Sequence, residues 1–276
     1  MIQDIYPDIL DNSYSPLTLG SGDFLLCFDR EGRLLVNGES GAIRFPTAEE
    51  AAAERSVYGF SVNEDRYFIA LSEHSCKAEG FEYFNMRGLR DRFGGTELFA
   101  AFTAYHLWRW YDDNRCCGKC GTPLGLHGTE RALLCPECGY ILYPRINPAV
   151  IVGVIKGDSL LITRYNRGYA HNALVAGFTE IGETLEQTVS REVMEETGVR
   201  VKNIRYYKSQ PWGMAQDILV GFYCEAEGSG KIHMDKNELK YAEWVKREDI
   251  VLQPNNFSLT NEMMRMFRDG LIKAGE

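Results

Sequence analysis

Short apolar runs broken by turn residues dominate the chain from about residue 22 to residue 75. The runs at 24–28, 33–36, 42–46, 57–62 and 67–71 have the length and residue types of short strands. From 95 to 113 the spacing changes, and apolar residues recur at the interval of a helix. The pattern predicts a β-rich N-terminal domain over residues 1–113 that ends in this helix.

The region 146–276 alternates longer apolar runs with helical spacing. Continuous apolar runs at 148–155 and 159–165 predict buried strands, and the run at 218–227 predicts another. Helical spacing returns at 260–272. These residues are therefore expected to form a second domain that mixes strands with helices.

A helix is predicted between Thr184 and Gly198. Thr184 and Gln187 have the spacing of a capping box, and Gly198 suits the C-terminal end of a helix. The buried face is expected to consist of residues four apart, Leu185, Val189 and Val193.

Composition fits a soluble globular protein, with 45% hydrophobic and 25% charged residues. No apolar run approaches the roughly 18–20 residues that span a bilayer, and the start of the chain lacks the features of a signal peptide. A cytoplasmic protein without a membrane partner is expected. The net charge of −9 argues against broad binding of a nucleic-acid backbone.

Five of the eight cysteines crowd into residues 116–138, which is typical of metal binding in a reducing compartment. Two Cys-x-x-Cys turns, separated by fourteen residues, supply four thiolates for a tetrahedral Zn²⁺ site. The expected ligands are Cys117, Cys120, Cys135 and Cys138. Because four protein ligands close the coordination sphere, this zinc is expected to be structural. We assign residues 114–145 to a zinc ribbon.

Two alternatives accompany this assignment. Cys116 competes with Cys117 as a ligand, although the Cys-x-x-Cys spacing favours Cys117. A zinc ribbon is also typical of binding proteins, so a zinc-ribbon binding protein is the rival from a different functional class. Few basic residues lie near the cysteines, which disfavours a nucleic-acid-binding ribbon.

Three glutamates of the predicted helix, Glu192, Glu195 and Glu196, are spaced so that their carboxylates share one face. Like charges this close destabilise a helix unless something compensates them. Mg²⁺ or Mn²⁺ prefers such oxygen ligands and keeps water molecules for a phosphate substrate. The competing interpretation is a solvated acidic face on which Arg191 pairs with Glu183.

The spacing of residues 177–199 resembles the Nudix box of the Nudix hydrolase family. The matching positions are Gly177, Glu183, Arg191, Glu192, Val193, Glu195, Glu196, Gly198 and Val199. The resemblance implies an α/β/α sandwich that hydrolyses a nucleoside diphosphate linked to a further group. It also implies that Glu192, Glu195 and Glu196 are catalytic and bind Mg²⁺ or Mn²⁺, and that Glu183 and Arg191 form a bracing ion pair.

By the same resemblance, the Ala176 carbonyl and Glu238 are further metal ligands; the other interpretation of Glu238 is a surface carboxylate. Metal ions would neutralise pyrophosphate charge and lower the pKa of the attacking water, whose proton a glutamate accepts. The resemblance leaves this general base open between Glu196 and a glutamate outside the box.

The order of a β-rich domain, a zinc ribbon, a Nudix domain and the sequence SQPW is similar to the NADH pyrophosphatase subfamily. Its pattern Ser-Gln-Pro-Trp-Pro-Phe-Pro-x-Ser is matched at residues 209–212, whereas Gly213, Met214, Ala215 and Asp217 depart from it. Trp212 has two interpretations, a core aromatic beside a turn or a surface on which a ligand stacks. The resemblance favours the ligand.

The subfamily implies hydrolysis of NADH or NAD⁺ to nicotinamide mononucleotide and AMP by a homodimer. ADP-ribose, a diadenosine polyphosphate, or the NAD cap of an RNA are alternative substrates. The substrate contacts implied are Arg90, Glu130, Tyr143, Phe178, Gln210, Pro211, Trp212, Gly213, Met214, Ala215, Gln216, Asp217 and Thr260. For Tyr143 the alternative is core packing at the domain joint.

Overall fold

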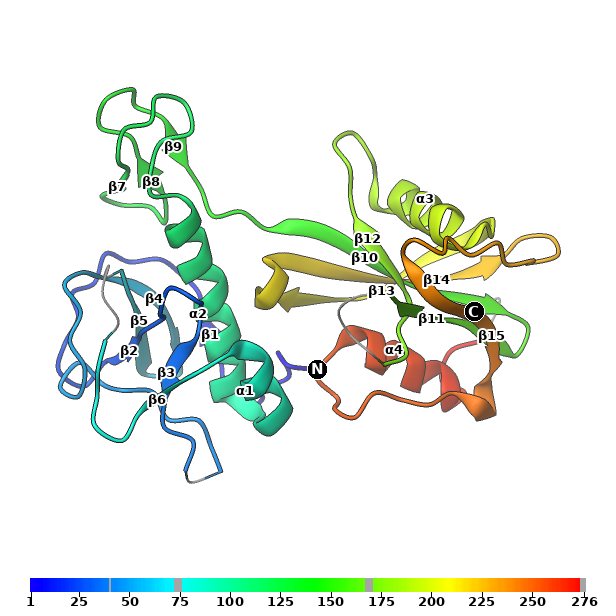
Figure 1. The fold of residues 1–276 in the computed structure, drawn as a ribbon, viewed down its shortest axis with the longest axis horizontal. Helices are drawn as coiled ribbons and strands as arrows, with labels where there is room; N and C mark the ends of the chain where they lie inside the picture. The colour runs from blue at the N-terminus through cyan, green and yellow to red at the C-terminus, as the bar shows by residue number, and fades with distance from the viewer. Residues whose placement is uncertain (40, 72–75, 167–170, 274–276) are drawn as a thin grey trace. The chain divides into compact units, whose positions relative to one another are not determined.

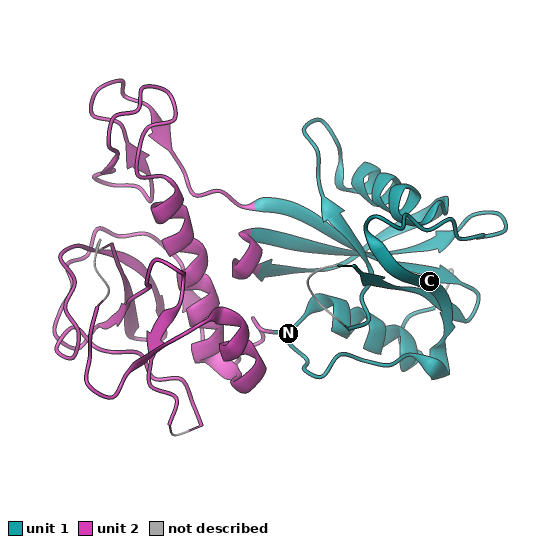
Figure 2. Ribbon diagram, in the orientation of Figure 1, with its two compact units in different colours: residues 1, 147–211, 217–276 teal, residues 2–146, 212–216 magenta. Residues whose placement is uncertain are grey.

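The computed structural model describes residues 1–39, 41–71, 76–166 and 171–273 (Figure 1). Figure 2 shows its two compact units, of which one comprises residues 2–146 with 212–216, and the other residue 1, 147–211 and 217–276. None of the helices in the described ranges combines the length and apolar character needed to cross a membrane.

Short strands build the first unit, which confirms the β-rich N-terminal region. A four-stranded sheet has the order β1–β4–β5–β2, and β3 pairs with β6. The bounds are β1 Leu10–Asp11, β2 Phe24–Leu26, β3 Leu34–Val36, β4 Ser56–Val62, β5 Asp65–Ala70 and β6 Glu82–Phe84. The strand expected at 42–46 is wrong, because this run forms only an isolated bridge from Arg44 to Asn37. Pro46 lacks the amide hydrogen that would extend a ladder.

Two helices follow these strands, α1 (Met86–Arg92) and α2 (Gly95–Asp113), and α2 has the bounds predicted from the apolar spacing. A three-stranded sheet, β7–β8–β9, comes next (Figure 1). Its strands are Gly125–Leu126, Leu133–Leu134 and Ile141–Leu142. Strands this short bury little apolar surface, so the four cysteines between α2 and β9 are expected to supply the cohesion of this region.

The second unit is a mixed six-stranded sheet with the order β13–β14–β10–β11–β15, in which β12 also pairs with β10. The central strands β10 and β14 are parallel, whereas β11 and β12 run antiparallel to β10. The bounds are β10 Asn147–Lys156, β11 Ser159–Tyr165, β12 Val175–Phe178, β13 Val201–Trp212, β14 Asp217–Ala226 and β15 Leu239–Lys246. The strands expected at 148–155, 159–165 and 218–227 are therefore present.

Helices cover both faces of this sheet, α3 (Leu185–Thr197) on one and α4 (Leu259–Arg268) on the other (Figure 1). On the α3 side, Val189 and Val193 pack against valines of β10. On the α4 side, Met263, Met264 and Phe267 pack against isoleucines of the same strand. This is the predicted α/β/α sandwich.

The ends of α3 follow the sequence signals. Thr184 and Gln187 form the predicted capping box, and Gly198 ends the helix in the left-handed conformation with φ of 68°. The helix expected at 260–272 is shorter, because α4 ends at Arg268. Gly270, with φ of 77°, leaves the helical conformation before the last apolar residues of the run.

Candidate functional site: the carboxylates of α3 and the cysteine cluster

Arg191 lies at the centre of the acidic residues of α3. Its guanidinium binds Glu183 at 2.6 Å, Glu192 at 2.7 Å and Glu195 at 3.0 Å. A further nitrogen donates to the carbonyl of Phe178 at 2.9 Å, which ties the helix to the end of β12. The expected ion pair with Glu183 is present, and Arg191 compensates two further carboxylates. The helix therefore tolerates its cluster of like charges.

Glu196 is the most buried of the three box glutamates, with 2% of its surface exposed. The Tyr165 hydroxyl donates to its carboxylate at 3.2 Å and lies 3.4 Å from the carbonyl oxygen of Ala176. Burial, together with the negative charge of Glu192, raises the pKa of the Glu196 carboxyl to about 8. A bound cation would reverse this shift, because it favours the charged carboxylate.

The end of β12 lies directly against Glu192. A Cβ atom added to Gly177 would come within 2.0 Å of the Glu192 carboxyl carbon, so a larger residue there would displace the Glu192 carboxyl group. The five residues between Gly177 and Glu183 thus connect the end of β12, which lies against Glu192, to an acidic residue that pairs with Arg191. Glycine at position 177 therefore leaves room for the Glu192 carboxyl group against the end of β12.

Glu238 precedes β15 and is exposed. Its negative charge contributes to the raised pKa of both Glu192 and Glu196, so it lies in the same electrostatic neighbourhood. Among the described residues, the glutamates do not form a close group of three or more potential metal ligands. What the site offers a metal ion is a set of oxygen donors, which suits Mg²⁺ or Mn²⁺.

The four predicted zinc ligands form a compact cluster. The sulfur atoms of Cys117, Cys120, Cys135 and Cys138 lie within 4.8 Å of one another. Cys120 is 3.4 Å from Cys135 and 3.6 Å from Cys138. Cys116 is outside this cluster, as the spacing argument favoured. Gly121 and Gly139, with φ of 78° and 70°, form left-handed turns directly after each Cys-x-x-Cys pair.

Comparison with known proteins agrees with this geometry. Residues 145–267 match the NUDIX domain family, and this range runs from β10 into α4 and includes the whole carboxylate site. Residues 145–267 are a Nudix domain.

The chain is also similar to curated proteins with the name NAD-capped RNA hydrolase NudC. Those of Salmonella heidelberg and Salmonella typhi are each 45% identical over 150 residues, 54% of this chain. The match covers 58% of each relative, so the chain spans somewhat more than half their length. A NUDIX hydrolase from Nitrosomonas europaea of known crystal structure is 21% identical, with a TM-score of 0.49, over 56% of this chain and 91% of that one.

Two of the expected substrate contacts, Tyr143 and Glu130, contact each other in the first unit. The Tyr143 hydroxyl, just after β9, donates to the Glu130 carboxylate at 3.0 Å. Tyr143 is 54% exposed, so it is not a core residue. This hydrogen bond, with the charge of Glu130, raises the pKa of Tyr143. The pair presents a phenol and a carboxylate to solvent, and these groups can form hydrogen bonds with hydroxyl and amide groups of a ligand.

Gln210 lies in the interior of the Nudix domain and is fully buried. Its amide nitrogen donates to the Phe257 carbonyl at 2.8 Å, and its amide oxygen accepts from the Leu259 backbone at 2.7 Å. Both ends of the amide therefore attach β13 to the start of α4. The geometry supports a structural role for Gln210, rather than the substrate contact expected from the sequence.

We expect Gln210→Ala to lower the free energy of unfolding by about 2–4 kcal/mol, because it leaves a backbone donor and acceptor buried without partners. Urea denaturation followed by circular dichroism measures this change. Lys202→Ala, at an exposed position of the same strand, is the control and is expected to stay within about 0.5 kcal/mol of the parent. Equal stability of the two variants would contradict the structural role.

Trp212 and Gly213 belong to the first unit, together with α2. The Trp212 ring packs edge-on against Phe102, with the ring centroids 5.4 Å apart. A Cβ atom on Gly213 would lie 2.0 Å from the Phe102 carbonyl oxygen. This approach gives a reason for glycine where the subfamily pattern has proline. The contact between Trp212 and Phe102 favours the interpretation of Trp212 as a core aromatic beside a turn.

Gly213→Ala is expected to destabilise the protein by about 1–3 kcal/mol, because the new methyl group overlaps backbone atoms that cannot rotate away. Gly22→Ala introduces the same methyl group where no atom lies within 4 Å, so it is the matched control. Thermal unfolding measures both. A melting temperature for Gly213→Ala equal to that of the control would show that the close approach does not persist in solution.

The other expected substrate contacts are spread over both units. Gln216, in the left-handed conformation, accepts a hydrogen bond from Arg145 at 3.0 Å. Asp217 is 4% exposed, one of its carboxylate oxygens has no partner among the described residues, and burial raises its pKa to about 7. Phe178 is 51% exposed at the end of β12.

For the remaining positions, the contacts within the described part of the chain do not distinguish a ligand role from a structural one. Arg90, in α1, pairs with Asp91. Thr260 lies in the first turn of α4, Pro211 near the end of β13, and Met214 and Ala215 in the short helix at 213–215. Sequence reasoning missed Tyr165, which contacts Glu196, and Arg145, which contacts Gln216.

Proposed function

We propose that this chain hydrolyses the pyrophosphate bond of NAD, either as the free cofactor NADH or NAD⁺ or as the cap of an RNA. The observation that carries the proposal is the geometry of the carboxylate site. The Tyr165 hydroxyl lies beside both the Ala176 carbonyl and the Glu196 carboxylate, and Arg191 pairs with the neighbouring Glu192. A buried carboxylate beside a backbone carbonyl is a set of oxygen ligands for a divalent cation. The name of the curated relatives supports NAD as the substrate.

The proposed Mg²⁺ or Mn²⁺ ligands are Ala176, Glu192, Glu195, Glu196 and Glu238. Bound metal ions would neutralise pyrophosphate charge and lower the pKa of the attacking water. Glu196 is the candidate for the glutamate that accepts the proton of the attacking water, because its carboxylate is buried and lies beside the Tyr165 hydroxyl. Arg191 orients Glu192 and Glu195 through direct hydrogen bonds. Water adds to one phosphorus atom and the bridging oxygen leaves with the other, which yields two monophosphates.

The four-cysteine cluster is proposed to bind Zn²⁺ with a structural role, because all four positions of a tetrahedron are occupied by thiolates. Tyr143 and Glu130 are proposed as substrate contacts. We further propose that the protein is a homodimer and that it lies in the cytoplasm, where the reducing environment keeps cysteines free of disulfides.

The test is to incubate the purified full chain with Mn²⁺ or Mg²⁺ and, separately, NADH, ADP-ribose and NAD-capped RNA, and to identify products by mass spectrometry. Nicotinamide mononucleotide is expected from NADH and from the cap. Turnover of ADP-ribose as fast as that of NADH would refute the NAD assignment. Faster turnover of the capped RNA than of NADH would assign the cap as the preferred substrate.

A further inference from the structure

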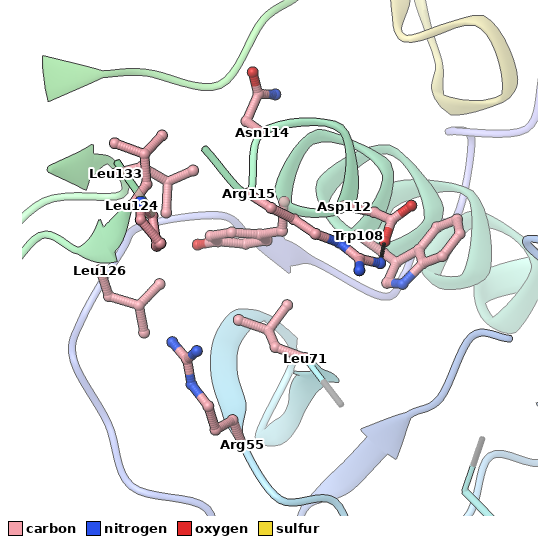
Figure 3. Close-up of a pocket in the computed structure, with 11 residues that line it drawn as sticks. Arg55, Leu71, Trp108, Asp112, Asn114, Arg115, Leu124, Leu126 and Leu133 are labelled. Carbon is pink, nitrogen blue, oxygen red and sulfur yellow. Dashed lines mark hydrogen bonds and ion pairs between the residues drawn. The ribbon is translucent and has the colours of Figure 1, made fainter. Parts of the chain in front are cut away.

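A pocket of about 250 Å³ lies within the first unit, where the C-terminal end of α2, the ends of β4 and β5, and the ribbon meet (Figure 3). Its apolar wall comes from leucines of the strands and of the ribbon, Leu71, Leu124, Leu126 and Leu133. Trp108 and Tyr111 of α2 line it as well, and both are buried. The carboxylates of α3 and the pair Tyr143–Glu130 are not among the residues that line this pocket.

The charges of the pocket leave one cation without a counterion among the described residues. Two arginines line it, and Arg115 is paired with Asp112. The Arg55 guanidinium forms no ion pair or side-chain hydrogen bond with a described residue, and Figure 3 shows it directed toward the space between Leu71 and Leu126. One positive charge beside aliphatic side chains complements one negative charge on an apolar body.

The volume of the pocket limits the size of ligand that it can bind. Sites for drug-sized molecules are usually about 300–1,000 Å³, so this smaller pocket has no room for a dinucleotide. The aromatic rings of Trp108 and Tyr111 are 6% and 7% exposed, which leaves little ring surface for a base to stack on. Aliphatic surface is accessible in the wall, since Leu126 is 37% exposed. These observations favour an aliphatic acid over a nucleotide.

We infer that this pocket is a second binding site, distinct from the carboxylate site of α3, for a small organic carboxylate with an apolar body. Arg55 binds the carboxylate, and Leu71 and Leu126 contact the apolar part. Because the ribbon supplies one wall, the site depends on the folded state of the cysteine cluster. The inference is independent of the proposed hydrolysis of NAD.

Isothermal titration of the full chain with octanoate tests the site directly, with octanamide, AMP and inorganic phosphate as comparison probes. Octanoate is expected to bind, and octanamide to bind roughly tenfold or more weakly, because it lacks the charge that Arg55 recognises. The absence of octanoate binding, equal binding of octanamide, or tighter binding of AMP or phosphate would each overturn the inference.

Two variants locate the binding, and both positions are exposed, so neither is expected to impair folding. Arg55→Gln is expected to weaken octanoate binding roughly tenfold or more, whereas the control Arg87→Gln, on the exposed face of α1, leaves it unchanged. Leu126→Glu places a negative charge in the wall and is expected to abolish binding. Melting temperatures confirm that each variant is folded. Equal effects of Arg55→Gln and Arg87→Gln would place the ligand elsewhere.

Discussion

Glu196→Gln is expected to reduce the rate of NADH hydrolysis by about 10²–10⁴-fold, the range that loss of a general base typically produces. Glutamine keeps the size of the side chain and its hydrogen bond with Tyr165 but removes the charge that a cation and a proton both need. The rate of nicotinamide mononucleotide formation, measured at saturating Mn²⁺, gives the size of the effect. Because glutamine also removes a charge that burial disfavours, the metal-free protein is expected to keep its melting temperature.

Glu186→Gln is the matched control for this prediction. Glu186 lies on the same helix but is exposed, and Arg191 pairs with Glu183, Glu192 and Glu195 instead. Its replacement is expected to leave the rate within about twofold of the parent, since exposed charges contribute little at a distance. A Glu196→Gln variant as active as Glu186→Gln would refute the metal and proton roles together.

Cys135→Ser is expected to remove the metal ion from the ribbon and to unfold residues 114–145. Cys135 is 1% exposed and its sulfur lies 3.4 Å from that of Cys120. Structural zinc contributes about 10–16 kcal/mol of binding free energy in isolated zinc-finger peptides, far more than these three short strands can replace. Zinc content by mass spectrometry is expected to fall from one ion per chain to almost none, and proteolysis to begin in the ribbon.

The neighbouring cysteine supplies the control. Cys116 is exposed and stands outside the cluster, so Cys116→Ser is expected to keep one zinc ion and the parental resistance to proteolysis. Loss of zinc from Cys116→Ser as well would show that Cys116 takes part in the site. Parent protein that contains no zinc when purified without chelator would refute the zinc assignment itself.

Local signals in the sequence predicted much of this molecule. The capping box of α3, its buried valines and the spacing of its glutamates all lie within one helix, where residue spacing alone determines which side chains are neighbours. The four cysteines were equally predictable, because the two Cys-x-x-Cys turns define their own geometry. In both cases the chemistry depends on residues close together in the chain.

The contacts that the sequence did not predict join residues that are far apart in the chain. Gln210 meets Phe257 and Leu259, and Gly213 meets Phe102, across separations that no spacing rule covers. A polar residue inside a family signature looks like a ligand contact from sequence alone, although a buried amide that joins two elements produces the same pattern. Tyr165 was missed because nothing next to it in the chain indicates that Glu196 lies beside its hydroxyl.

The division of the chain into two units also affects the design of shorter fragments for expression. Residues 212–216 belong structurally with 2–146, although they lie between two strands of the Nudix domain. A fragment cut at residue 147 would retain this segment but lose Phe102, against which Trp212 packs. Such a fragment would expose an indole ring at the end of a strand, a feature that promotes aggregation. Expression trials of the Nudix domain alone therefore call for a polar replacement of Trp212, or for the intact chain.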